Sequence, residues 1–136
     1  MHKAMPCLLA ACLVLALDSA DATSSNPSAA VLRSSYTSCV KEAGGDMAPM
    51  QACMDEEFAY QDKRLNAVYK RLMGSIDEGG QSRLRSEERD WLKAKRKACG
   101  PGKDPGQFQM IDSYSCEIGY TADRAEELEG REKLKK

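Results

Sequence analysis

The chain has 136 residues, with 20 lysines and arginines, 21 aspartates and glutamates, and one histidine. This length fits one small domain, and the near-neutral charge excludes the basic excess expected of a nucleic-acid-binding protein.

The N-terminal segment has the pattern of a secretion signal. Residues 5–17 are almost wholly apolar, and Ala20-Asp-Ala22 supplies the small-x-small pattern of a signal-peptidase site. The apolar run is too short to span a membrane, so we expect a signal peptide over residues 1–22 and a periplasmic or secreted protein. Leu9-Ala-Ala-Cys12 supports a competing interpretation, a lipoprotein with a lipid anchor at Cys12.

Export predicts disulfides for the cysteines that follow. Cys39, Cys53, Cys99 and Cys116 form an even set in a short chain, which indicates two disulfides. Because no Cys-x₂-Cys pair is present, we expect no zinc site. The residues favour the local pairing Cys39–Cys53 and Cys99–Cys116, with Cys53–Cys99 and Cys39–Cys116 as the alternative. Each local disulfide is worth about 3 kcal/mol in the loop-entropy model.

A long amphipathic helix dominates the region after the leader. Residues 23–35 are expected to be a flexible leader, overlapped by a short helix near residues 31–41. Asp46 is a suitable N-cap for the long helix, which should run to about Asp77, where Gly79-Gly80 would end it. Its apolar residues follow steps of three and four, the spacing of one helix face. They are Met50, Met54, Phe58, Leu65, Val68, Tyr69, Leu72 and Ile76.

Two further helices complete the predicted fold. The second, capped by Ser82, should run to about Ala98 and form an antiparallel hairpin with the first. A glycine- and proline-rich loop over 100–106 precedes a third helix near 108–129, which Gly130 should end before a charged tail at 131–136. Its candidate core residues are Met110, Ile111, Tyr114, Ile118, Ala125 and Leu128. Without any strand pattern, the prediction is an all-α domain over 36–130: a long helical hairpin, a third packed helix and two disulfides.

The expected mature chain offers little for catalysis. Its 19 basic and 19 acidic residues balance once Lys3, Asp18 and Asp21 leave with the signal, and the only histidine leaves with them. The common histidine-dependent arrangements are therefore excluded, and we predict no enzyme activity, cofactor or metal. Trp91 is expected in the core.

Two polar residues of the long helix need an explanation. Asp62 and Asn66, at i and i+4, flank the apolar stripe. We expect them in a buried network that ties the long helix to the Trp91 N–H group, Lys95 or Arg124. A binding site is the alternative.

One set of residues spread over most of the expected mature chain forms a recognisable pattern. It consists of Cys39, Met50, Cys53, Asp62, Leu65, Asn66, Tyr69, Leu84, Trp91, Cys99, Cys116, Thr121, Arg124 and Leu128. This pattern resembles the LprI-type lysozyme-inhibitor domain family of small exported bacterial helical domains. The resemblance covers about Tyr36 to Leu128. This chain has Glu88 where the family usually has glutamine and Lys95 where it usually has arginine.

The resemblance implies a disulfide-stabilised exported domain that inhibits lysozyme. We expect the motif residues to be mainly structural and the inhibitor to plug the cleft of a muramidase by surface complementarity, with acidic residues steering the approach. The candidate contacts are Asp55, Glu56 and Glu57, the loop over 100–106, or the acidic end of the third helix. A binding or immunity module for another envelope protein or toxin is the alternative.

Overall fold

Four helices make up the part of the chain that is described here. The structure is a computed structural model that describes residues 32–134, so the predicted signal peptide, Cys12 and most of the leader lie outside it. Its helices are α1 (Ser34–Glu42), α2 (Met47–Ser75), α3 (Glu78–Cys99) and α4 (Gln107–Lys133). The all-α prediction is confirmed, because residues 32–134 contain helices and no strand. None of these helices is long and apolar enough to cross a membrane.

Both disulfides follow the favoured local pairing. Cys39 is bonded to Cys53 and Cys99 to Cys116, with Cα atoms 5.8 and 5.4 Å apart. The first disulfide joins α1 to the beginning of α2, and the second joins the end of α3 to α4. Each pair of helices is thereby stapled near the connection between them.

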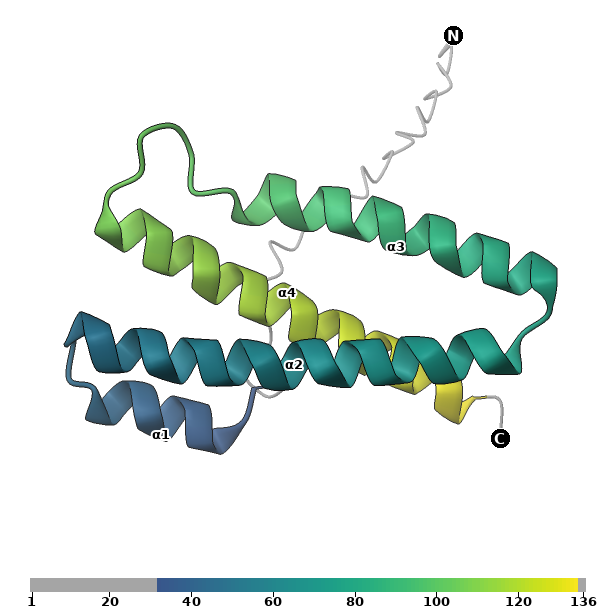
Figure 1. The fold of residues 1–136 in the computed structure, drawn as a ribbon, viewed down its shortest axis with the longest axis horizontal. Coiled ribbons are helices and arrows are strands. Elements are labelled where there is room, and N and C mark those ends of the chain that lie inside the picture. The colour runs from purple at the N-terminus through teal and green to yellow at the C-terminus, as the bar shows by residue number, and fades with distance from the viewer. Residues whose placement is uncertain (1–31, 135–136) are drawn as a thin grey trace, which may run out of the picture.

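The predicted hairpin of α2 and α3 is open, and α4 fills the space between its arms. In Figure 1, α2 and α3 run in opposite directions from a tight connection, and α4 lies between them and crosses α2 in the view. α4 packs extensively against α2 and also contacts α3, whereas α2 and α3 touch each other only sparsely. α1 folds back along the first half of α2.

The core forms where α2, α3 and α4 meet. Half of its buried side chains come from the stripe predicted on α2, and half-buried Tyr69, Met73, Ile76 and Trp91 pack around it. The buried cluster consists of Leu65, Val68, Leu72, Leu84, Ala125 and Leu128. Trp91 is half-buried and packs against this core from its edge. The expectation that Met110 is a core residue is wrong, because its side chain is 51 % exposed.

The connection between α2 and α3 is shorter than the glycines suggested. Asp77, and not Ser82, caps α3, because its carboxylate accepts a hydrogen bond from the Gly80 N–H group at 2.7 Å. Gly79 and Gly80 therefore begin α3 instead of ending α2. A Cβ atom on Gly80 would lie 3.0 Å from the Asp77 carboxylate and 3.2 Å from Ile76 Cβ, so the absence of a side chain lets the cap close.

α4 also continues past its predicted end. Gly130 lies inside the helix, which runs to Lys133 through part of the predicted charged tail. Arg131 contacts the Glu87 carboxylate of α3, and Arg71 of α2 donates to Glu132 at 2.8 and 3.0 Å. The last turns of α4 are therefore in contact with both neighbouring helices.

Candidate functional site

A groove between α2 and α3 collects six of the fourteen residues that carried the family pattern, together with the two positions at which this chain departs from it. We call it the α2–α3 groove; it has a volume of about 220 Å³. Thr121 of α4 is buried and forms its base, so the groove opens where the two arms of the hairpin separate. It is lined by Asp62, Leu65, Asn66 and Tyr69 of α2, Glu88, Trp91, Leu92 and Lys95 of α3, and Thr121.

Helical periodicity places these side chains on the two facing walls. The α2 residues lie at positions 62, 65, 66 and 69, and the α3 residues at 88, 91, 92 and 95. Steps of three and four bring side chains to one face of a helix. Glu88 and Leu92 were not predicted as site residues, although Glu88 lies three positions before Trp91 and Leu92 lies four positions after Glu88.

The expected buried network around Asp62 and Asn66 is not formed. Both residues are exposed, and the Asn66 amide donates to the carboxylate and to the backbone carbonyl of Asp62, each at 2.9 Å. The i,i+4 spacing lets the pair satisfy itself on the surface of α2, so it needs no partner from another helix. Asp62 and Asn66 therefore present polar groups to the groove and do not tie helices together.

Arg124 holds the α3 side of the groove in place. Its guanidinium is 6 % exposed and donates to Glu88 through Nε at 2.8 Å and to Glu127 through Nη1 at 2.6 Å. Two carboxylates thus compensate the buried cation, as a buried charge requires. The Glu88 of this chain, which departs from the family pattern, gives Arg124 a charged partner across α3 and α4.

Lys95 places a cation among the aromatic rings at one end of the groove. Its Nζ lies 5.2 Å from the Trp91 ring centroid, 5.8 Å from that of Phe58, and 3.9 Å from a Glu117 carboxylate oxygen. Ring faces attract cations at about this distance. Lys95 therefore supplies a positive charge where the family usually has arginine, without the planar double donor.

The three acidic residues predicted to contact a partner have different environments. Glu57 is fully buried, so it cannot touch a partner directly, and its carboxylate accepts from Arg33 Nε and from the Gln61 amide, both at 2.7 Å. Its helical phase explains the burial, since it lies four positions after buried Cys53 and four before buried Gln61. Asp55 and Glu56 are exposed and remain candidate contacts.

Asp55 also links α2 to the beginning of α4. Its carboxylate accepts a hydrogen bond from the Tyr114 hydroxyl at 2.8 Å and another from the Gln51 amide at 3.0 Å. Burial and this bond to Asp55 raise the pKa of Tyr114 to about 12. The neutral phenol is therefore the donor in this hydrogen bond at neutral pH.

The acidic end of α4 is largely engaged by arginines. The Arg64 guanidinium donates to both Glu129 oxygens at 2.7 Å and lowers the pKa of that carboxyl. Burial alone would raise the pKa of Glu127, but the hydrogen bonds and positive charges of Arg124 and Arg131 together outweigh it, so that pKa is also lowered. These carboxylates hold helices together, which leaves the expectation of a contact surface here without support from the geometry.

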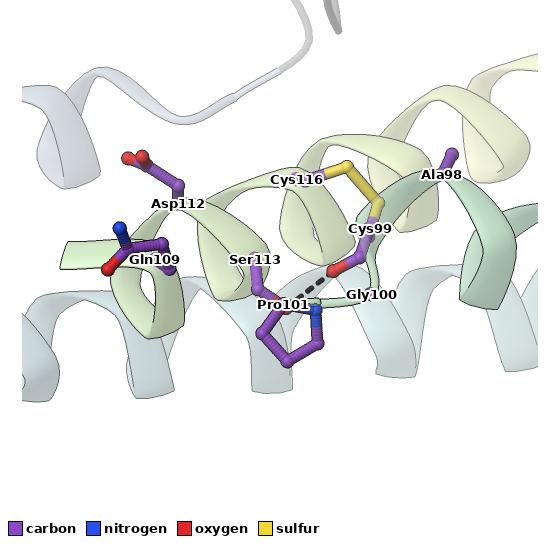
Figure 2. A pocket seen from close by; sticks show the side chains of 8 residues that line it. All are labelled: Ala98, Cys99, Gly100, Pro101, Gln109, Asp112, Ser113 and Cys116. Atoms are coloured by element: carbon purple, nitrogen blue, oxygen red, sulfur yellow. Dashed lines mark hydrogen bonds between the residues drawn. A yellow bond between two sulfur atoms is a disulfide. The ribbon is translucent and has the colours of Figure 1, made fainter. Parts of the chain in front are cut away.

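A second hollow, of about 240 Å³, lies beside the Cys99–Cys116 disulfide (Figure 2). The Ser113 hydroxyl donates to the backbone carbonyl of Cys99 and fixes the start of the loop over 100–106. Asp112 points away from this bond in Figure 2. Since its polar groups do not converge, this hollow is better explained as the edge of a stapled loop than as a ligand site.

The chemistry of the groove is that of binding. It offers two carboxylates, an amide, an ammonium and two aromatic rings. Within residues 32–134, no group of three or more histidine, cysteine or acidic side chains is placed to hold a metal ion.

The fold and the groove together define a small helical domain, stapled by two disulfides, that presents binding groups on its surface. More specifically, the chain belongs to the lysozyme inhibitor LprI family, whose sequence model matches residues 39–128. The resemblance predicted from the sequence is thereby confirmed. No curated protein and no solved structure matches the chain.

Membership of this family bears on enzyme activity, binding partner and location. The family is generally non-enzymatic, and membership implies binding to lysozyme. Together with the two disulfides, it suggests an extracytoplasmic location.

Proposed function

We propose that the protein is an exported, non-enzymatic inhibitor of a lysozyme, acting in the periplasm or outside the cell by covering the substrate cleft of the enzyme. The observation that carries this proposal is the family match, which spans all four cysteines of both disulfides. Glycosidases of this kind place two carboxylates in a cleft, and an inhibitor needs only to occupy that cleft.

The contacts to lysozyme would be local, because the expected mature chain is close to neutral. Asp55 and Glu56 lie on the exposed side of α2 and can steer a basic enzyme over a short range. The loop over 100–106 is exposed along its whole length, and the disulfide at its start limits its motion. Restricting a contact loop in advance reduces the entropy lost on binding.

The direct test is a lysis assay, in which the fall in turbidity of a cell-wall suspension measures the activity of lysozyme. The purified, oxidised protein should slow lysis by a lysozyme of the animal, invertebrate or phage class in a dose-dependent way. Reduced and alkylated protein is the matched control and should be inactive, because the staples are lost. Unaltered lysis by all three classes, with the inhibitor in large molar excess, would refute the proposal.

The α2–α3 groove favours one alternative, a binding or immunity module for another envelope protein or toxin. A groove of about 220 Å³ with exposed polar side chains is not needed for cleft occlusion. If a periplasmic extract yields a stoichiometric partner other than lysozyme, and turbidity assays show no inhibition, this alternative replaces the inhibitor.

A further inference from the structure

The α2–α3 groove contains hydrogen-bond acceptors that the fold does not use. The Asn66 amide binds Oδ2 of Asp62, and Arg124 binds Oε1 of Glu88. Within residues 32–134, no hydrogen bond reaches Asp62 Oδ1, Asn66 Oδ1 or Glu88 Oε2. Ionised carboxylate oxygens and amide oxygens only accept hydrogen bonds, so these three atoms select a ligand rich in donors.

The aromatic residues of the groove point to a cation as that ligand. Trp91 and Tyr69 line the same space as the free acceptors. The position of Lys95, with Nζ 5.2 Å from the Trp91 ring centroid, already demonstrates that one end of the groove accommodates a positive charge. Two carboxylates and two rings disfavour an anion, which would meet like charges and the negative faces of the rings.

We propose that the α2–α3 groove receives an arginine side chain from a basic partner protein. A guanidinium carries five donors and no acceptor, is planar, and stacks on aromatic faces, so it matches Asp62, Glu88 and Trp91 together. A volume of about 220 Å³ accommodates one long side chain and excludes a helix or strand. Lysine would satisfy fewer of the acceptors, since its ammonium is a compact point charge.

The arginine site would be one of the contacts between the proposed inhibitor and its target. It rests on the proposed function only for the identity of the basic partner, a lysozyme. The groove and the surface around Asp55 and Glu56 both involve α2. An arginine in the groove would therefore anchor a basic enzyme through the same helix that carries the proposed acidic contacts. Arginine is a frequent anchor residue in protein interfaces.

Trp91 is the only tryptophan in the chain, so its fluorescence reports on the groove alone. Titration of the purified, oxidised protein with N-acetyl-arginine amide should change this fluorescence in a saturable way. The citrulline analogue has nearly the same shape without the charge and should bind at least about tenfold more weakly, since hydrogen bonds to charged groups are the stronger ones. An equal response to both compounds, or a saturable response to N-acetylglucosamine alone, would overturn the proposal.

Two substitutions in the groove should change the affinity for the arginine probe in opposite directions. Asp62→Asn should weaken binding of the arginine probe by about tenfold, because it removes an exposed charge of the groove. Lys95→Met should strengthen binding, because it removes a like charge, whereas an anion site would show the reverse. Asp90→Asn is the matched control, because Asp90 is an exposed aspartate of α3 that does not line the groove, and it should bind the probe as the unchanged protein does. Circular dichroism and melting curves establish that each variant is folded.

The same variants separate failure of the groove from failure of the inhibitor function. If the unchanged protein binds the arginine probe but does not slow lysis, the inhibitor proposal fails and the groove proposal stands. If Asp62→Asn loses neither probe binding nor inhibition, the groove proposal fails and the inhibitor proposal stands. Loss of both in Asp62→Asn, with both retained in Asp90→Asn, supports the two together.

Discussion

Replacing Arg33 with alanine should destabilise the domain by about 3 kcal/mol. Arg33 is the residue before α1, and its Nε donates to the Glu57 carboxylate at 2.7 Å. Glu57 is fully buried, and it also accepts from the Arg33 backbone N–H group at 3.2 Å and from Gln61 at 2.7 Å. The substitution would remove the only cation paired with this buried carboxylate within residues 32–134.

The magnitude follows from the burial of one partner and the exposure of the other. Breaking a buried ion pair by removing one side typically costs about 3–5 kcal/mol, because the remaining charge is left uncompensated. We expect the lower end of this range, since the Arg33 side chain is 28 % exposed and two hydrogen bonds to Glu57 Oε1 survive the substitution.

Urea unfolding followed by circular dichroism measures the effect as a change in the free energy of unfolding. The matched control is Arg71→Ala, which removes an exposed arginine paired with Glu132 and should leave stability close to that of the unchanged protein. Adding Glu57→Gln to Arg33→Ala should restore part of the loss, because the uncompensated charge disappears. The reasoning is refuted if Arg33→Ala is no more destabilising than Arg71→Ala, or if the second substitution restores nothing.

Three further predictions test the staples, the ion pairs and the groove. Replacing Cys99 and Cys116 by serine should lower the free energy of unfolding by about 3 kcal/mol in urea, and an unchanged midpoint would contradict the loop-entropy argument. Because Arg64 lowers the pKa of Glu129, their pairing stabilises the fold above the ordinary carboxyl pKa of about 4.3, and this contribution is lost as pH falls through the lower folded value. Unfolding between pH 6 and 3 should therefore show a steeper acid loss than in Arg64→Met, and identical slopes would contradict it. Asp62→Ala should change stability by no more than about 0.5 kcal/mol, because Asp62 is exposed and bonded only within its own helix, whereas a clearly larger loss in thermal unfolding would return it to a structural role.

Periodicity and loop chemistry were enough to predict the helices and the disulfide pairing. The three- and four-residue steps from Met54 to Leu72 mark the face of α2 that forms the core. Cys39 and Cys53 flank a single turn, so their pairing needs only local closure. Both inferences use information contained in one short stretch of sequence.

The features that were missed depend on partners distant in sequence or on local caps. Glu57 is paired with Arg33, which lies 24 positions away, so the acidic run alone cannot show that this carboxylate has a cationic partner inside the fold. Gly80 suggested a helix end, but the Asp77 cap uses it as a beginning. Asp62 flanks the apolar stripe, and only the opening between α2 and α3 decides that it faces a groove instead of a neighbouring helix.

The central position of α4 has a consequence for the order in which the chain can fold. Apolar residues of α2 near position 68 are covered by α4 residues near position 125, so the core closes only after almost the whole chain has been made. Before that point only α1 and α2, and later α3, can form local contacts, and the Cys39–Cys53 bond can already close across its short loop. A chain threaded through an export channel from its N-terminus would thus acquire its first staple early and its core last, with α2's apolar stripe uncovered until the final helix arrives.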